Sequence, residues 1–294
     1  MKSTGERMIP EENKGEVFWA EHYVRYTLSS QFVRNKTVLD IACGSGFGSH
    51  YLAMKGAKKV IGVDISREAI SYARKKYAAR NIEYLVGDCE DIPLPEGSVD
   101  MVVSFETIEH VKDYKKFLSE IKKVVKPDFL VIISTPNRVV YPEGNPFHIK
   151  EFNFLELENL LSKYFKNTKF LYQNNWFSSA VLDKNGVEKE DLFIGLEDVK
   201  LLKLVSDKPH KSLYYVVLAS DKELPSNIIF PIGLTTPFID FNENLISLTQ
   251  KVEIMEGNIS KKNEELKNIY NSRSWEIAMK LKKIKKSIPF IKDF

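Results

Sequence analysis

Short apolar runs alternate with amphipathic stretches over the first 220 residues of the chain. The apolar runs have the length and composition of parallel strands that are buried on both faces. They lie at residues 38–43, 59–64, 81–86, 98–104 and 129–134. Because stretches with helical periodicity, such as 49–56 and 66–77, fall between them, the pattern predicts an α/β domain with a mostly parallel sheet.

The first apolar run ends in glycines at alternate positions. Gly44, Gly46 and Gly48 follow directly after it. Without a Cβ, Gly44 and Gly46 let the backbone approach a ligand, and the next helix directs its first amide N–H groups toward the same place. Turns of this kind bind nucleotides in open α/β sheets. Since Ser49 occupies the third glycine position of the dinucleotide motif, the sequence argues against NAD.

The segment from Asp40 to Gly46 resembles the first motif of class I S-adenosylmethionine (SAM) methyltransferases, acid-x-Gly-x-Gly-x-Gly, with Ala42 at the first glycine position. The resemblance implies a Rossmann-like, seven-stranded sheet that is closed by antiparallel strands, here 167–177 and 212–219. It also implies SAM as the cofactor. SAM carries an ammonium and a sulfonium, so a carboxylate at Asp40 suits this loop.

Further cofactor-binding residues are expected where the next strands end. The separation of Asp64 from Gly44 is about that at which an acidic residue hydrogen-bonds the ribose hydroxyls of a bound nucleotide. Asp64 could instead cap the helix that follows. The resemblance implies that Asp88 accepts from the adenine amino group and that the backbone at Cys89 meets the ring. The expected cofactor-binding set is Asp40, Ala42, Gly44, Gly46, Asp64, Ile65, Asp88, Cys89 and Ser104.

Candidate acceptor-side residues follow the fourth and fifth strands. Residues 105–111 are expected to open a helix, which would place Glu106, Glu109 and His110 on one face. His148 lies in the loop after the fifth strand. Because neighbouring parallel strands end at the same edge of a sheet, these side chains are expected to converge. The catalytic candidates are His110, Glu109 and His148.

The same four residues resemble the Glu-x-x-Glu-His block and distal histidine of small-RNA 3′-end 2′-O-methyltransferases, and the block also occurs in ubiquinone-biosynthesis O-methyltransferases. The resemblance implies a divalent cation on Glu106, Glu109, His110 and His148. Such a cation would lower the pKa of an acceptor hydroxyl, and the donor set suits Mg, Mn, Fe, Co or Zn. In the alternative, the glutamates stabilise a helix N-terminus and His110 is a general base or a packed side chain.

Residues 1–35 are interpreted as an N-terminal cap with a helix over 15–32. The stretch 5–10, followed by Glu21-His22 and Arg25-Tyr26, resembles the leader of methyltransferases from cell-surface polysaccharide gene clusters. In many class I methyltransferases this segment folds over the cofactor and acceptor. Arg7, His22 and Tyr26 are therefore further site candidates.

A heptad pattern covers residues 242–270. Its a positions are Leu245, Val252, Ile259 and Leu266, and its d positions are Leu248, Met255, Lys262 and Ile269. The narrow apolar seam predicts a coiled coil and a homo-oligomer, whereas a helix packed on its own domain would usually bury a wider stripe.

The chain ends in a basic tail, with a net charge of +5 from Arg273 onward. Asn271 to Trp275 resembles a segment that follows coiled coils in surface-glycan glycosyltransferases and methyltransferases. Residues 275–290, with apolar side chains among lysines, would suit peripheral contact with an anionic membrane. A solvated tail is the alternative.

Composition narrows the function classes. The whole chain of 294 residues carries a net charge of +3, so the part before the tail is nearly neutral and no nucleic-acid partner is expected. The two cysteines, Cys43 and Cys89, favour a reducing compartment. Because neither a signal peptide nor a membrane span is visible in the sequence, a cytoplasmic location is expected.

The sequence as a whole predicts a SAM-dependent methyltransferase that acts on a sugar hydroxyl of a surface glycan or its lipid-linked precursor. A quinone or phenol O-methyltransferase, or a SAM-binding scaffold that recruits a glycosyltransferase, are the alternatives. The expected organisation is a cap at 1–35, a methyltransferase domain at 36–222, a linker at 223–241, and a coiled coil with a basic tail at 242–294. Residues 178–211 are expected to be an insertion that shapes acceptor choice.

Overall fold

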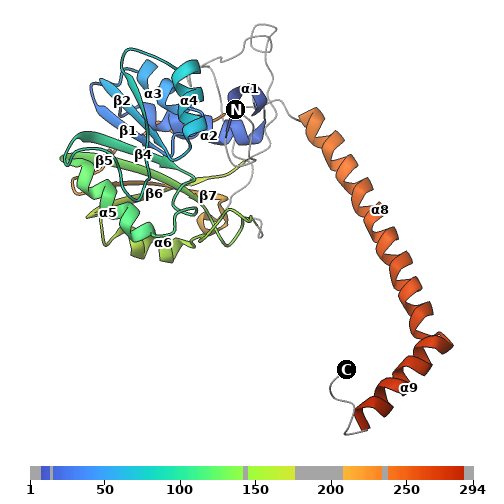
Figure 1. Cartoon of the computed structure of the whole chain (residues 1–294). Helices are drawn as coiled ribbons and strands as arrows, with labels where there is room; N and C mark the ends of the chain where they lie inside the picture. The colour runs from blue at the N-terminus through green and yellow to red at the C-terminus, as the bar shows by residue number, and fades with distance from the viewer. Residues whose placement is uncertain (1–7, 14–15, 142–144, 176–207, 234–237, 288–294) are drawn as a thin grey trace. The chain divides into compact units, whose positions relative to one another are not determined.

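The computed structural model describes residues 8–13, 16–141, 145–175, 208–233 and 238–287. The chain divides into two compact units, residues 1–235 and 236–294. The first unit contains a seven-stranded sheet with strand order β3-β2-β1-β4-β5-β7-β6 (Figure 1). The strands are β1 (Thr37–Ile41), β2 (Lys59–Asp64), β3 (Ile82–Val86), β4 (Val99–Phe105), β5 (Val125–Pro136), β6 (Asn167–Gln173) and β7 (Tyr214–Ser220).

The first five strands pair in parallel, and β7 pairs antiparallel with both β5 and β6. The predicted fold class is therefore confirmed, including the antiparallel strands that close the sheet. Because β1 and β4 are central neighbours, the turns that follow them lie at the same edge. This edge is where ligands bind in open α/β sheets.

Helices cover both faces of the sheet in the described part of the chain (Figure 1). The helices of this unit are α1 (Pro10–Asn13), α2 (Val17–Ser30), α3 (Phe47–Met54), α4 (Arg67–Lys76), α5 (Tyr114–Val124), α6 (Phe154–Leu161) and the 3₁₀ turn η1 (Pro209–Lys211). The apolar residues of α5 and α6 join one core cluster, whereas those of α2 and α3 join another. Leu39 belongs to the first cluster and Val38 to the second, so β1 is buried on both faces as its apolar run predicts.

The predicted helix over residues 105–111 is wrong. Phe105 is the last residue of β4, and Glu106 has a φ of 50°, in the left-handed region. Helix α5 begins only at Tyr114, because the Asp113 carboxylate caps it by accepting from the N–H groups of Lys115 and Lys116. A turn therefore places Glu109 and His110, and the expected shared helix face does not exist.

The second unit consists of α8 (Phe238–Tyr270) and α9 (Arg273–Ser287). The Ser272 hydroxyl accepts from the Trp275 N–H and caps α9, which explains why the helical chain breaks there. The seam side chains that the structure describes on α8 are largely exposed: Val252, Met255, Ile259, Leu266 and Ile269. The heptad region is therefore helical with an exposed apolar seam, and the coiled coil itself stays a prediction. None of the described helices combines the length and the hydropathy that a membrane span requires.

Candidate functional site

The glycine-rich turn after β1 adopts backbone conformations that favour glycine. Gly44 and Gly46 have φ values of 54° and 84°. A Cβ at Gly46 would stand 2.5 Å from Cβ of Ala73. Ala42 also has a positive φ, of 60°, and is thus a strained member of the same turn. The requirement for Gly46 is therefore both conformational and steric.

A cavity of about 460 Å³ lies beside this turn. We call it the loop cavity. It is lined by eight of the residues that the sequence singles out, namely His22, Tyr26, Ala42, Gly44, Asp64, Ile65, Glu106 and His110. Aromatic walls are added by Phe47, Phe105 and Phe147. Aromatic side chains can accommodate either a flat ligand ring or the C–H face of a sugar.

Asp40 lies behind the wall of the loop cavity. It is 1% exposed, and its carboxylate accepts from the Ser49 hydroxyl at 2.6 Å and from the Tyr26 hydroxyl at 3.2 Å. Burial raises the pKa of Asp40 to about 7, although both hydrogen bonds favour the charged form. Asp40 therefore anchors the turn from within and is not part of the described cavity wall.

Helix α2 packs directly on the glycine turn. A Cβ at Gly48 would lie only 1.7 Å from the ring of Tyr26, so the ring occupies the space that the missing side chain leaves. His22 donates from Nδ1 to the Phe18 carbonyl at 3.0 Å, and burial together with Arg25 lowers its pKa to about 3. His22 is thus neutral at physiological pH. The third N-terminal candidate, Arg7, lies outside the described residues, as does most of the expected insertion at 178–211.

Asp64 fits both roles that were considered for it. Its two carboxylate oxygens accept from the N–H groups of Gly44 and Ser66, each at 2.8 Å. It therefore joins the turn after β1 to the start of α4, whose N-cap is Ser66. Asp64 is also part of the cavity wall, where the remaining lone pairs of its oxygens can accept from ligand hydroxyls.

Five of the nine expected cofactor-binding residues are not part of the described cavity wall, namely Asp40, Gly46, Asp88, Cys89 and Ser104. The Asp88 carboxylate accepts from the Glu90 N–H at 2.8 Å and thereby shapes the turn after β3. Cys89 packs against the hydrophobic core. Ser104 is fully buried in β4, and its hydroxyl has no hydrogen-bond partner among the described residues.

Glu109, His110 and His148 lie close together at the turn after β4. One potential ligand atom from each lies within 4.8 Å of the others. We call these three residues the histidine cluster. The sequence expectation that they converge agrees with this arrangement, although a turn, rather than a helix, brings them together. Glu106 is absent from the cluster, because its carboxylate is held by Ser134 and Arg25.

Hydrogen bonds define the orientation of both imidazole rings. His110 Nδ1 lies 3.0 Å from the Phe147 carbonyl, and His148 Nδ1 lies 2.5 Å from the Glu151 carboxylate. Because carbonyl and carboxylate oxygens only accept, Nδ1 carries the proton in each ring, and Nε2 is the basic nitrogen of the neutral form. Sequence reasoning missed Glu151, although its spacing of three residues from His148 was a usable signal.

Glu109 is fully buried. Its Oε2 accepts from the Thr135 hydroxyl at 2.9 Å, while Oε1 has no hydrogen-bond partner in the described part of the chain. Burial raises the pKa of Glu109 well above its usual value, and the nearby charge of Glu106 adds to this effect. A buried oxygen without a partner next to two imidazoles is the arrangement that a cation or an acceptor hydroxyl would complete.

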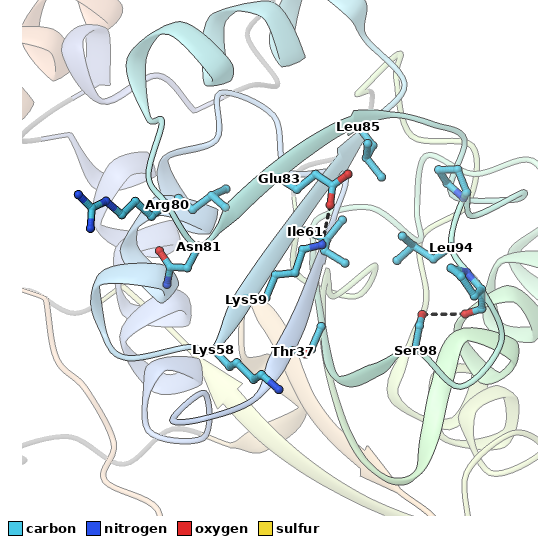
Figure 2. Close-up of a pocket in the computed structure, with 13 residues that line it drawn as sticks. Thr37, Lys58, Lys59, Ile61, Arg80, Asn81, Glu83, Leu85, Leu94 and Ser98 are labelled. Atoms are coloured by element: carbon cyan, nitrogen blue, oxygen red, sulfur yellow. Dashed lines mark hydrogen bonds and ion pairs between the residues drawn. The ribbon is translucent and has the colours of Figure 1, made fainter.

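A second, larger cavity of about 750 Å³ opens at the amino ends of β1, β2 and β3 (Figure 2). Lys59 and Glu83 form an ion pair of 2.6 Å within it. None of the site residues expected from the sequence lines it. Since ligands of α/β sheets bind at the carboxyl ends of the strands, the chemistry belongs to the loop cavity.

A parallel sheet with its glycine turn after β1, and with a carboxylate after β2 at the same cavity, is the arrangement of a Rossmann-like, nucleotide-binding α/β domain. Comparison with known proteins agrees: residues 39–133 match the family described as "Methyltransferase domain". Residues 39–133 of the chain therefore form a methyltransferase domain, and S-adenosylmethionine is the cofactor that such a domain implies. The predicted fold is confirmed, and the match agrees with the predicted enzyme class and cofactor.

The similarity to individual proteins is partial. The chain is 36% identical over 163 residues to a protein of Mycolicibacterium smegmatis named "Probable S-adenosylmethionine-dependent methyltransferase"; the match covers 54% of this chain and 62% of that protein. It is 34% identical over 110 residues to the ubiquinone biosynthesis O-methyltransferase of Neisseria meningitidis, covering 36% of this chain and 46% of that enzyme. The matches thus span about three fifths of the first relative and less than half of the second.

Among solved structures, the PH0226 protein of Pyrococcus horikoshii has a similar fold. It superposes with a TM-score of 0.52, with 19% sequence identity, over 76% of this chain and the whole of that chain. At this identity the similarity supports the fold alone.

Replacing Asp64 with alanine should weaken SAM binding more than it weakens binding of a SAM analogue without ribose hydroxyls. Hydrogen bonds to a charged acceptor contribute roughly 1.5 to 3 kcal/mol. SAM loses its ribose hydrogen bonds in the variant, whereas the analogue never makes them. Titration calorimetry with both ligands measures the difference. An equal loss for the two ligands would show that Asp64 acts only by holding Gly44 and Ser66.

Proposed function

We propose that this protein transfers the methyl group of SAM to a hydroxyl oxygen of an acceptor bound at the histidine cluster. The observation that carries the proposal is the pairing of His148 with Glu151 beside Glu109 and His110. His110 also lines the loop cavity, where the cofactor turn lies. One imidazole of the histidine cluster, that of His110, therefore lies at the cavity where the methyl group and the acceptor must meet.

The chemistry follows from these groups. The acceptor oxygen attacks the methyl carbon in line, the S–CH₃ bond breaks as the O–CH₃ bond forms, and S-adenosylhomocysteine leaves. The hydroxyl proton passes to Nε2 of an imidazole in the histidine cluster. In His148 this nitrogen accepts from the Asn145 amide at 3.0 Å, so it takes the proton when the acceptor displaces that amide, and Glu151 then stabilises the imidazolium. Holding both reactants in one cavity supplies much of the rate enhancement.

The histidine cluster also fits a divalent cation. Two imidazoles and a carboxylate are a common donor set, and Oε1 of Glu109 is buried without a partner among the described residues. When bound, the cation would lower the pKa of the acceptor hydroxyl. Glu151 would then orient His148 as a metal ligand, a role that carboxylates often have beside ligating histidines.

The acceptor class is a further part of the proposal. The leader at residues 5–26 and the segment 271–275 resemble those of surface-glycan enzymes, which supports a sugar hydroxyl of a glycan or its lipid-linked precursor. The aromatic walls of the loop cavity and the name of the ubiquinone biosynthesis relative support a quinol or phenol. Methyl transfer from labelled SAM to lipid-linked glycans and to a panel of quinols and phenols tests both classes. Binding of SAM without transfer to any acceptor would instead favour the scaffold function.

Removing divalent cations should abolish methyl transfer and leave SAM binding unchanged. The proposed cation contacts the acceptor through the histidine cluster, whereas the glycine turn binds the cofactor. Dialysis against a chelator, followed by an activity assay and by calorimetry with SAM, separates the two effects, and readdition of single metals identifies the ion. Full activity in a metal-free preparation would leave the imidazoles as general bases without a cation.

A further inference from the structure

The chain that follows β7 packs on helix α2. We call residues 224–233 the strap. Leu224 and Ile228 of the strap pack against the core cluster to which Tyr26 and Leu28 of α2 belong. The strap therefore adds apolar contacts to the helix that forms part of the wall of the loop cavity.

Gln31, the residue directly after α2, pairs with the backbone of the strap. Its side-chain Nε2 donates to the Ile229 carbonyl at 2.6 Å, and its Oε1 accepts from the Ile229 N–H at 2.9 Å. One side chain thus satisfies both backbone groups of one strap residue, as a paired residue of a neighbouring antiparallel strand would. Because a shift of the strap by one residue would break both hydrogen bonds, Gln31 fixes the position of the strap along α2.

Gly233, at the other end of the strap, lies against the middle of α2. A Cβ at Gly233 would stand 3.0 Å from Cγ1 of Val24 and 3.6 Å from Cβ of Ala20. The strap therefore runs antiparallel to α2, from Gln31 back to Ala20. The absence of a side chain at Gly233 permits this close approach, and a larger residue there would push the strap away from the helix.

The buried face of α2 is largely polar. Its buried residues include Glu21, Arg25 and Ser29. A helix is usually held to its domain by an apolar stripe, whereas a buried ion pair such as that of Arg25 with Glu106 contributes little net stability after the cost of desolvation. We therefore expect the docking of α2 to depend on contacts outside this face, and the strap supplies such contacts.

We infer that Gln31 and Gly233 are positioning residues through which the strap holds α2 in place, and that this contact determines how fast the cofactor dissociates. Helix α2 supplies His22 and Tyr26 to the wall of the loop cavity, and the Tyr26 ring fills the space beside Gly48 in the glycine turn. When the strap releases α2, the cavity loses this part of its wall. The inference concerns the cofactor and depends neither on the acceptor nor on methyl transfer.

The test measures two rates in the full-length protein, namely hydrogen exchange of the α2 backbone amides without cofactor and dissociation of S-adenosylhomocysteine. Gln31→Ala should increase both rates about tenfold, because the net contribution of two hydrogen bonds to the docked helix is lost. Gly233→Val should also increase both, because its side chain would collide with Val24. Exchange of the β5 amides should stay unchanged, which separates a local release of α2 from a loss of global stability.

Two control variants should leave both rates unchanged. Ser30→Ala, next to Gln31, removes only a hydrogen bond to the Thr27 carbonyl within α2. Phe230→Ser changes a strap side chain that is 63% exposed. Unchanged α2 exchange in Gln31→Ala and Gly233→Val would show that the strap does not hold the helix.

Two further results would overturn the inference. Faster α2 exchange with an unchanged dissociation rate would show that α2 does not retain the cofactor. Wild-type protein that does not bind S-adenosylhomocysteine would overturn the inference together with the cofactor assignment. Because neither measurement requires methyl transfer, the result is independent of the proposed acceptor chemistry.

Discussion

Replacing His148 with alanine should lower kcat for methyl transfer about 100-fold to 10,000-fold, the usual contribution of general acid–base catalysis. SAM binding should be unchanged, because His148 does not line the loop cavity in which the glycine turn lies. The imidazole is held by Glu151 at 2.5 Å and by the Asn145 amide at 3.0 Å. Alanine therefore removes the basic nitrogen together with both of these hydrogen bonds. Single-turnover assays with labelled SAM, alongside calorimetry, measure the two effects separately.

Two further variants define what the histidine does. Glu151→Gln keeps a hydrogen-bonding side chain of the same size but removes the charge, and it should cause a smaller loss of kcat than His148→Ala. His210→Ala replaces an exposed histidine of η1 and should retain full activity. Wild-type turnover in His148→Ala would remove the histidine cluster from the mechanism.

A chain that ends at Ser272 should lose co-sedimentation with anionic lipid vesicles completely, whereas its oligomer mass and SAM binding should stay those of the full-length protein. Six lysines lie between Lys280 and Lys292, and each lysine near an anionic surface contributes about 1 kcal/mol. If residues 242–270 form a parallel coiled coil, each oligomer presents several copies of the segment 280–292 at one end. Their weak affinities for the vesicle surface then combine by avidity. Raising the salt concentration should release the full-length protein from the vesicles.

The oligomer requires its own variant. Ile259→Lys places a charge in the exposed apolar seam of α8 and should convert the oligomer to a monomer, while Lys261→Glu, at an exposed position outside the seam, should not. Light scattering gives the mass in each case. A monomeric full-length protein, or one that does not bind anionic vesicles at low salt, would contradict this account of residues 242–290. The terminus would then be a docking surface for another protein.

Much of the fold could be predicted from sequence because the information is local. The apolar run of β1, the glycines after it and Asp64 at the end of β2 all lie in one short stretch of chain. The handedness of the connections between the parallel strands follows from the general chirality of βαβ units. The histidine cluster was foreseen for the same reason, since the ends of adjacent parallel strands must meet.

The position of Glu106 was not predictable, because it depends on a turn and on distant partners. A helix over residues 105–111 would have placed Glu106 with Glu109 and His110, but the Asp113 cap starts α5 only at Tyr114. Arg25, on a helix that precedes the sheet, then meets Glu106 across 81 positions of sequence. No local pattern specifies a contact of this range.

The sequence by itself determined the α/β class of the domain and the edge of the sheet at which a ligand binds, because strand periodicity and glycine turns are properties of neighbouring residues. The cofactor followed from the resemblance of the segment from Asp40 to Gly46 to class I methyltransferases. Only the tertiary structure decided what each acid does. Asp40 lies behind the cavity wall with Tyr26 and Ser49, Glu106 pairs with Arg25, and Glu151 orients His148. A carboxylate's role depends on burial and on the donors that surround it, and both arise only when distant segments pack together.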